Sequence, residues 1–378
     1  MTNSTRHNER ALFRNPEPAS QYLLTAPAIL YGLFMAGRST LYELIPGLSR
    51  KVEIPVICVG NLTTGGTGKT PMVAYLADYF RKQGLQVAIL SRGYGRRLSK
   101  QPLILPPHSP SRHLSTRELG DEALMLHQQR PEAALVLDGD RVRGAETAIK
   151  QLGPDLILMD DGLQHRRLRR NFNLVMIDSQ KLFGNRRLLP AGSLRESLTA
   201  IRRADAVVLN KFDQHHPQFY REAAEILNHI SPARLFCARY NFRHFAAAAG
   251  NAIRDSAAMK KLGPFCAFSG LANNQYFFAQ LRALGLHPEE TISFSDHHHY
   301  QAGDLKDLLK RSASLTLVTT AKDAVKLKAL TGREENPLRQ RLWVAEIGLK
   351  IDNEDRFSAL FKPFLTPSGR QNLKAARP

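Results

Sequence analysis

A glycine-rich segment that ends in lysine and threonine follows a strongly apolar run near residue 54. The run from Ile54 to Val59 predicts a buried strand, and the next residues read Gly-Asn-Leu-Thr-Thr-Gly-Gly-Thr-Gly-Lys-Thr, from 60 to 70. Apolar residues then recur at helical spacing at Val73, Leu76, Ala77 and Phe80. A strand, a glycine-rich turn, Lys-Thr and a helix together present backbone N–H groups and a helix N-terminus to phosphate.

This segment therefore predicts a nucleotide phosphate site made of Thr63, Thr64, Gly65, Gly66, Thr67, Gly68, Lys69 and Thr70. We expect Lys69 to reach the β- and γ-phosphates and the Thr70 hydroxyl to bind Mg²⁺. The strict pattern has glycine at position 63, where this chain has threonine. A purely structural glycine turn is the alternative.

Two adjacent aspartates end a second predicted strand, which runs from Asp155 to Met159. Asp160 and Asp161 stand where the acid that holds Mg²⁺ in phosphate-binding proteins is found, although they could simply cap a turn. His165 follows in the same loop, and it either lines the site or bonds within its own turn.

Asp121 and Glu122 begin a predicted helix. One interpretation is a favourable N-terminus, and the other is a base that takes a proton from an acceptor hydroxyl. The segment Asn210-Lys211-Phe212-Asp213 follows a predicted strand and has the pattern with which many GTPases bind guanine. A SIMIBI-type GTPase is therefore a rival function.

Three adjacent histidines, His297 to His299, lie far downstream. Neighbouring side chains in an extended loop point in different directions, so we expect a catalytic or substrate-contacting histidine rather than a zinc site, with a solvated loop as the alternative. Cys58, Cys237 and Cys266 are far apart, which disfavours a disulfide framework and fits a reducing compartment.

The elements that must position these residues alternate between strands and helices. Further strands are predicted at Gln86–Leu90, Ala134–Leu137, Leu174–Ile177, Ala206–Leu209, Pro264–Phe268 and Leu315–Thr319, and a helix at Phe277–Leu284. This alternation predicts a doubly wound parallel sheet with ligands at the strand ends. We expect a core at 51–245, a smaller α/β domain at 246–366, and a disordered basic tail at 367–378.

The charge is strongly positive. The 378 residues include 53 Lys and Arg against 34 Asp and Glu, a net charge of +19, while 43% of residues are hydrophobic. This composition excludes a wholly disordered chain and a polytopic membrane protein, and the charge favours an anionic partner. The region from Leu163 to Arg203 holds ten of the basic residues, but no nucleic-acid module is evident, so we expect no nucleic-acid partner.

Residues 1–50 contain an uncharged stretch from Tyr22 to Gly37. It is shorter than a bilayer-spanning segment, so it predicts an amphipathic helix in a membrane interface. A helix packed on the body of the protein and a cleaved signal peptide are the alternatives, and Glu9 and Glu17 argue against the signal peptide.

Six motifs together resemble tetraacyldisaccharide 4'-kinases, the lipid A kinases of Gram-negative bacteria. They are Val59–Pro71, Ser91–Arg96, Gly120–Glu122, Asp160–His165, Leu194–Glu196 and Asp296–His297. The resemblance spans about Tyr22 to Lys328, and the threonine at 63 is shared by that family. It implies a P-loop fold, ATP and Mg²⁺, an anionic glycolipid substrate, and a peripheral protein on the cytoplasmic face of the inner membrane. We expect no obligate protein partner.

The resemblance also implies roles for individual residues. Asp121 is similar to the family's general base, with His297 as its partner from the second domain and Lys69 as a catalytic residue. Thr70, Glu122, Asp160 and Asp161 match the Mg²⁺ site. The remaining active-site matches are Tyr94, Arg141, Gln164, His165, Arg195 and Glu196. A nucleotide-gated lipid-binding module without transferase activity is a third functional class.

Overall fold

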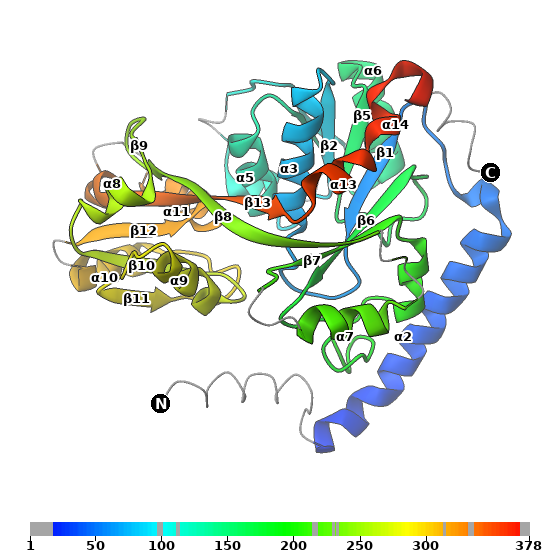
Figure 1. The fold of residues 1–378 in the computed structure, drawn as a ribbon, viewed down its shortest axis with the longest axis horizontal. Coiled ribbons are helices and arrows are strands. Elements are labelled where there is room, and N and C mark those ends of the chain that lie inside the picture. The colour runs from blue at the N-terminus through cyan, green and yellow to red at the C-terminus, as the bar shows by residue number, and fades with distance from the viewer. Residues whose placement is uncertain are drawn as a thin grey trace.

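The computed structural model describes residues 18–96, 101–110, 114–213, 218–228, 231, 234–312, 315–331 and 336–370. Within these ranges the chain forms two lobes joined by one 13-stranded sheet (Figure 1). Its strand order is β11-β10-β12-β13-β8-β7-β6-β1-β5-β2-β4-β3, with β9 paired to β8. The expected α/β fold with a parallel, doubly wound core is confirmed.

The first lobe carries the parallel part of the sheet that ends at the glycine-rich segment. Its parallel strands are β1 (Val56–Gly60), β2 (Val87–Ser91), β4 (Ala134–Leu137), β5 (Leu156–Asp160), β6 (Phe172–Asp178) and β7 (Ala206–Asn210). The short β3 (Leu103–Leu105) is antiparallel to β4. Because β1 lies between β5 and β6, residues that follow β1 and β5 meet at one edge, where sheets of this kind bind ligands.

Helices cover both faces of this part of the sheet. Alternate β1 side chains point to opposite sides, so Ile57 packs with α3 (Lys69–Lys82) and α5 (Asp121–Gln129), while Cys58 packs with α6 (Arg141–Leu152). The predicted apolar face of α3 is buried as expected. The lobe also contains α4 (Thr116–Leu119), η2 (Leu198–Arg203) and α7 (Gln218–Ile226).

The second lobe repeats the α/β pattern on a smaller scale. Its strands are β9 (Ile253–Arg254), β10 (Phe265–Ser269), β11 (Glu290–Ser293), β12 (Thr316–Thr320) and β13 (Leu342–Ile351). Its helices are α8 (Ser256–Lys260), α9 (Asn274–Ala283), α10 (Ala302–Ser312), α11 (Ala321–Thr331) and α12 (Pro337–Arg341). The strands predicted in both lobes are present, with ends shifted by at most two residues.

Strand β8 (Leu235–Ala247) belongs to both lobes. Its first residues pair in parallel with β7, and the rest pairs antiparallel with β13 (Figure 1). The domain boundary expected between residues 245 and 246 therefore falls inside a strand. A sequence pattern could not reveal this, because a long strand does not show where it changes partners.

The end of the chain returns to the first lobe. After β13, α13 (Glu354–Ala359) and α14 (Lys362–Leu365) pack on α3 and β6, with Phe357, Phe361 and Phe364 in the core of the first lobe. The expected assignment of all of 246–366 to the second domain is wrong for this segment. Residues 367–370 are helical, and Arg370 pairs with Asp155 at 3.2 Å. The expected tail is thus ordered there, and the rest of it, 371–378, lies outside the described residues.

The N-terminal segment forms one long helix, α2 (Pro18–Leu44), followed by η1 (Pro46–Leu48). In Figure 1 the helix runs along one side of the first lobe, as the dark blue ribbon. Among the described helices, none has the length and apolar character needed to cross a bilayer. Residues 1–17 of the expected N-terminal segment lie outside the described residues.

Candidate active site

The glycine-rich loop between β1 and α3 is held open by left-handed glycines. Gly65 and Gly68 have φ angles of 100° and 92°. A Cβ at Gly68 would lie 2.0 Å from the Asn210 Nδ2 atom, so only glycine fits there. The Thr64 N–H donates to the Ser193 carbonyl over 2.8 Å, which ties the loop to a neighbouring segment.

Thr63 replaces the expected glycine without disturbing this loop. It forms an antiparallel bridge with Leu194, and its side chain is buried. Lys69, the first residue of α3, donates to Asn61 Oδ1 over 3.2 Å and lies 3.7 Å from Asp161 Oδ1. The lysine is therefore directed to the same edge of the sheet as the acids that follow β5.

The segment that begins at Asn210 supports the loop from below. The Asn210 side-chain amide donates to the Thr67 carbonyl over 3.0 Å. Lys211 donates to the Gly66 carbonyl over 2.9 Å and pairs with Asp178 at 2.5 Å. Both side chains are thus bound to the glycine-rich loop itself, a role that the guanine-binding hypothesis did not anticipate.

Asp160 ends β5 in a buried position beside the start of α5. Burial, followed by the Glu122 and Asp161 carboxylates, raises the pKa of Asp160 to about 7. Its Oδ1 atom has no hydrogen-bond partner among the described residues. Thr70 Oγ1 lies 3.3 Å from Glu122 Oε2, so three of the four expected Mg²⁺ ligands gather here.

Asp161 is engaged by cations instead. Arg195 Nη1 contacts both of its carboxylate oxygens, at 2.9 and 3.0 Å. Burial acts to raise the pKa of Asp161, but Lys69 and Arg195 outweigh it and hold that pKa below its ordinary value. The residue has a φ of 49°, a conformation that aspartate tolerates better than most residues. Its contacts fit a residue that holds the two cations in place.

The two lobes meet at Asp121 and His297. Asp121 Oδ2 lies 3.0 Å from His297 Nδ1, although the residues are 176 positions apart. Asp121 is buried at the start of α5, while His297 is in a loop after β11 with a φ of 55°. The ring of the largely exposed Tyr94 stands edge-on to that of His297, with 6.0 Å between centroids. The expected pairing of Asp121 with His297 is thus present as a contact.

A cluster of cations surrounds His165. Burial lowers the pKa of His165 to about 4, and the effect is increased by the charges of Arg141, Arg92 and Arg38. Arg141 is buried and donates to the Asp138 carbonyl, but its Nε and Nη2 atoms have no partner among the described residues. A neutral imidazole among guanidinium groups with free donors is suited to an anionic group.

Two expected residues support the site without facing the acids. The Gln164 amide donates to the Asn61 carbonyl over 3.0 Å, and the Gln164 carbonyl accepts from Arg38. Glu196 is buried and paired with Arg203. Gln164 thus connects its own loop to the residue that follows β1 and to α2, whereas the partner of Glu196 belongs to the nearby η2.

The basic region between Leu163 and Arg203 is partly used inside the protein. Arg166 binds Ser39 and Glu43 of α2, and Arg170 donates to the Gly162 and Leu163 carbonyls. Arg195 and Arg203 have the acidic partners described above. The exposed basic residues of the region are Arg167, Lys181, Arg186, Arg187 and Arg202.

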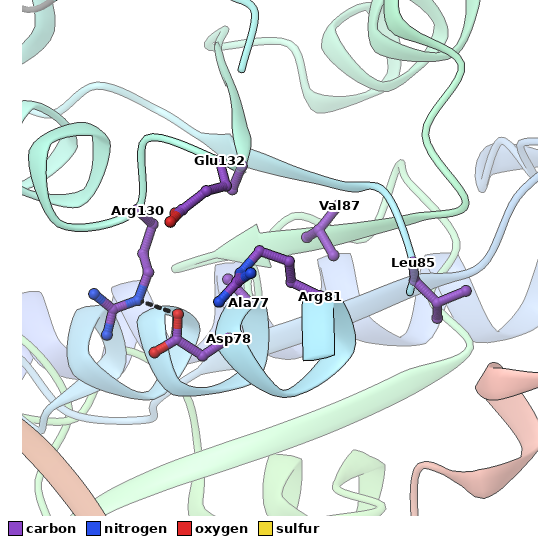
Figure 2. Close-up of a pocket in the computed structure, with 8 residues that line it drawn as sticks. Ala77, Asp78, Arg81, Leu85, Val87, Arg130 and Glu132 are labelled. Atoms are coloured by element: carbon purple, nitrogen blue, oxygen red, sulfur yellow. Dashed lines mark ion pairs between the residues drawn. The ribbon is translucent and has the colours of Figure 1, made fainter. Parts of the chain in front are cut away.

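A small surface hollow lies away from these residues, at the C-terminal half of α3 (Figure 2). Asp78 and Arg130 form a 2.7 Å ion pair across it. Its lining is Ala77, Asp78, Arg81, Leu85, Val87, Arg130, Glu132 and Ala133. None of the candidate site residues is among them, so the hollow is not part of the site.

Sequence reasoning missed several residues that the fold brings to the site, namely Arg38, Arg92, Lys322 and Lys326. Arg92 follows β2 within the motif Ser91–Arg96, which was recognised from the sequence without a role for this residue. Lys322 and Lys326 lie 3.3 Å from His297 Nε2 and 3.7 Å from Asp121 Oδ2. The four-residue spacing of Lys322 and Lys326 can be read in the sequence, but their contacts with His297 and Asp121 join segments that are distant in the sequence.

Comparisons with known proteins agree on one family. Residues 20–365 match the family model described as tetraacyldisaccharide-1-P 4'-kinase. A tetraacyldisaccharide 4'-kinase from Geobacter sulfurreducens is 39% identical over 82% of this chain and 85% of its own length. A tetraacyldisaccharide 4'-kinase from Brucella suis is 35% identical over 90% of this chain and 91% of its own length. The structure of LpxK from Aquifex aeolicus in complex with ATP is 31% identical, with a TM-score of 0.72 over 92% of this chain and 99% of that one.

Proposed function

The chain belongs to the tetraacyldisaccharide-1-P 4'-kinase family, and from that premise we propose how its residues perform the reaction. The protein is an ATP-dependent kinase that phosphorylates the 4'-hydroxyl of a tetraacylated glucosamine disaccharide 1-phosphate in lipid A biosynthesis. The observation that carries the residue assignment is the 3.0 Å contact between Asp121 and His297 beside the glycine-rich loop.

Asp121 is the proposed general base. It takes the proton of the 4'-hydroxyl as that oxygen forms a bond to the γ-phosphorus of ATP. The bond between the γ-phosphorus and the bridging oxygen breaks, and ADP leaves with the electron pair. His297 holds the Asp121 carboxylate from the second lobe, so the base is complete only when both lobes are in contact.

The glycine-rich loop is the proposed phosphate site. Residues 63–70 present backbone N–H groups, and Lys69 at the N-terminus of α3 adds a positive charge for the β- and γ-phosphoryl oxygens. The backbone N–H groups and the Lys69 ammonium stabilise the negative charge of the phosphoryl oxygens, which shifts during transfer. They therefore orient ATP and lower the energy barrier of the transfer.

The acids around Asp160 fit a Mg²⁺ ion. The buried, unpartnered Asp160 Oδ1 and the adjacent Glu122 and Thr70 oxygens are ligands of the type that Mg²⁺ prefers. No group of three acids, histidines or cysteines among the described residues could hold a metal ion alone. Mg²⁺ usually takes one or two carboxylates plus water and phosphate oxygens, so this set suffices. Bound Mg²⁺ supplies neutralisation of the phosphoryl charge.

The cations around His165 form the proposed entry for anionic groups. Arg141 has two buried donor atoms without partners among the described residues, and Arg92 and Arg38 add positive charge. The acceptor carries a 1-phosphate and the donor a triphosphate, so both ligands match this cluster in charge.

Helix α2 supports a peripheral position on a membrane surface. Its inner face is attached by polar contacts, because Tyr31 Oη donates to the Arg195 carbonyl over 2.7 Å and Ser39 accepts from Arg166. Its outer face is apolar, and Leu30, Leu33 and Phe34 are 66–68% exposed. An apolar face directed outward, with basic residues nearby, suits an anionic lipid surface. The proposed location is the cytoplasmic face of the inner membrane, where the glycolipid substrate is embedded.

The test is a transfer assay with purified protein, ATP, Mg²⁺ and the lipid disaccharide 1-phosphate in mixed micelles. Asp121→Asn is expected to lower kcat by roughly 10²–10⁴-fold while the affinity for ATP stays nearly unchanged. Asp355→Asn, at an exposed position in the first turn of α13, is the matched control and is expected to keep wild-type activity. An unchanged kcat for Asp121→Asn excludes this residue as the base.

The same assay separates the rival functions. A kinase of this family transfers phosphate to the lipid with ATP as donor. Turnover with GTP alone would indicate a GTPase, and nucleotide-dependent lipid binding without transfer would indicate a binding module.

A further inference from the structure

Two lysines of α11 face the two ends of the Asp121–His297 contact. Lys326 Nζ lies 3.7 Å from Asp121 Oδ2, and Lys322 Nζ lies 3.3 Å from His297 Nε2. The lysines are four residues apart and therefore share one face of the helix. Their helix follows β12 of the second lobe and packs against α5, which carries Asp121.

Lys326 is a buried cation, and its burial costs desolvation free energy. Its side chain is 7% exposed, and Nζ makes no hydrogen bond to the described residues. Its second carboxylate neighbour, Asp323, is fully buried, with Oδ1 at 3.9 Å. Burial lowers the pKa of Lys326, and the Asp323 and Asp121 charges oppose that change. An apolar side chain of similar size would avoid this desolvation, but it would leave the buried Asp323 and Asp121 carboxylates without their cation, so the charge of Lys326 serves these two acids.

Asp323 is itself held in place. Its Oδ2 accepts from the Gly270 N–H over 3.1 Å and from Thr320 Oγ1 over 2.7 Å. The Lys326 ammonium thus lies between the fixed carboxylate of Asp323 and that of Asp121, at 3.9 and 3.7 Å. The ammonium and His297 Nδ1 both approach the same oxygen of Asp121, Oδ2.

The contact between Lys322 and His297 is compatible with one tautomer of the neutral imidazole ring. An ammonium group can only donate hydrogen bonds, so His297 Nε2 is the acceptor of this contact. The proton of the neutral ring is then on Nδ1, which donates to Asp121. The Lys322 charge is balanced by Asp296 Oδ1 at 3.3 Å.

We propose that Lys322 and Lys326 are positioning residues for phosphoryl transfer. Lys322 fixes the Nδ1–H tautomer of His297, and Lys326 holds the Asp121 carboxylate in the orientation that receives the sugar proton. The proposal rests on the proposed role of Asp121. In this proposal the two lysines of α11 act on the reaction through His297 and Asp121.

The first experiment compares Lys326→Met, Lys326→Arg and Lys328→Met in the full-length protein. Lys326→Met keeps the length of the side chain and removes the charge, so kcat is expected to fall by about tenfold to a hundredfold. The KM values for ATP and lipid are expected to stay within about twofold. Tm is expected to fall but to stay above the assay temperature, because Lys326→Met leaves the buried Asp323 carboxylate without its cation. Lys326→Arg restores most of kcat, and Lys328→Met, on the same helix, behaves as wild type. A wild-type kcat for Lys326→Met overturns the proposal. A loss of kcat that Lys326→Arg does not restore, and that parallels the change in Tm in both variants, overturns it as well.

A double-mutant cycle tests whether Lys326 acts through Asp121. In the Asp121→Asn background, Lys326→Met is expected to cause no further loss of kcat. An equal fold-loss in both backgrounds overturns the proposal and leaves the role of Asp121 intact. If Asp121→Asn alone keeps wild-type kcat, the assignment of the base fails, and the proposal fails with it for that separate reason.

Nitrogen NMR of protein with ¹⁵N-labelled histidine tests the role of Lys322. The His297 signals, assigned by their loss in His297→Gln, are expected to show a protonated Nδ1 and an unprotonated Nε2. Lys322→Met is expected to shift them toward a mixture of tautomers, whereas Lys328→Met leaves them in place. Signals for a protonated Nε2 in the wild type overturn the tautomer assignment.

Discussion

Asp160 is destabilising in the protein without ligands. It is buried beside Glu122 and Asp161, and its pKa of about 7 lies well above the ordinary value of roughly 3.9. A carboxyl group with a raised pKa in the folded state destabilises that state once the pH exceeds the unfolded pKa. The penalty grows until the pH passes the folded pKa and is constant above it. A metal ion that binds the carboxylate would relieve this penalty.

Asp160→Asn is therefore expected to raise Tm at about pH 8 in the absence of nucleotide and metal. The corresponding gain in the free energy of unfolding is at most about 4 kcal/mol. The advantage is expected to shrink as the pH is lowered from about 7 toward 4, while kinase activity is lost at every pH. Thermal unfolding over this pH range measures it. Asp355→Asn, at an exposed position, controls for the loss of a negative charge. An advantage independent of pH would show that the Asp160 charge is not its source.

At the scale of elements, the loop between β1 and α3 depends on Asn210, which is 143 residues from Thr67 in the sequence. The side-chain amide of Asn210, at the end of β7, binds the Thr67 carbonyl. Any side chain at position 68 would collide with that amide, so glycine is required there. Strand order explains this dependence, because β7 and β1 flank β6 and end at the same edge of the sheet.

Asn210→Ala is expected to weaken ATP binding by about tenfold, since one buried hydrogen bond to the loop is lost. The preference for ATP over GTP is expected to stay the same, because the side chain contacts the loop. Calorimetric titration with both nucleotides measures it. Asn336→Ala, which removes the N-cap of α12 in the second lobe, controls for a general loss of stability. A change in nucleotide preference would instead support a role of this segment in binding the base.

Helix α2 is attached to the first lobe by one face only. The substitution of both Leu33 and Phe34 by serine is expected to weaken binding to vesicles that contain phosphatidylglycerol by about tenfold or more. Tm is expected to remain unchanged, because both side chains are 66% exposed. Vesicle flotation measures the binding. Ile253→Ser, 65% exposed on β9, is the control on the other lobe. Equal flotation of the double variant and the wild type would exclude the outer face of α2 as the membrane contact.

At the scale of the whole molecule, the chain closes on itself. Strand β8 carries it out to the second lobe, β13 carries it back, and α13 and α14 bury three phenylalanines in the first core. Phe361 is fully buried, and its ring lies 5.2 Å from that of Phe172 and 5.6 Å from that of Phe80. The core of the first lobe therefore includes residues that follow the second lobe in the sequence.

Phe361→Ala is expected to destabilise the protein by about 3–5 kcal/mol, because it leaves a cavity among packed rings. Urea unfolding measures the change. Phe34→Ala, which removes an exposed ring of α2, is the matched control and is expected to have little effect. A free energy of unfolding within about 1 kcal/mol of wild type would mean that α13 and α14 contribute little to the core.

The local features of this protein could be predicted from its sequence. Strands β1, β2 and β5, the glycine-rich loop and the apolar face of α3 each depend on residues that are close in the chain, where periodicity and glycine content suffice. The phosphate loop and the acids after β5 followed from chemistry at strand ends. The order of the motifs indicated the family, and the remaining site residues came from that resemblance. For the same local reason, the boundary of the domains and the place of the last helices were not predictable.

Tertiary structure alone decided how the candidate residues are combined. It brought Asp121 to His297, moved Asp161 into a pair with Arg195, bound Asn210 to the loop, and placed Lys322 and Lys326 beside the Asp121–His297 contact. Each of these contacts joins segments whose distance in space is set by strand order and by packing across the sheet. A sequence pattern records which groups are available, but contacts between distant segments depend on the energy of the whole packed arrangement.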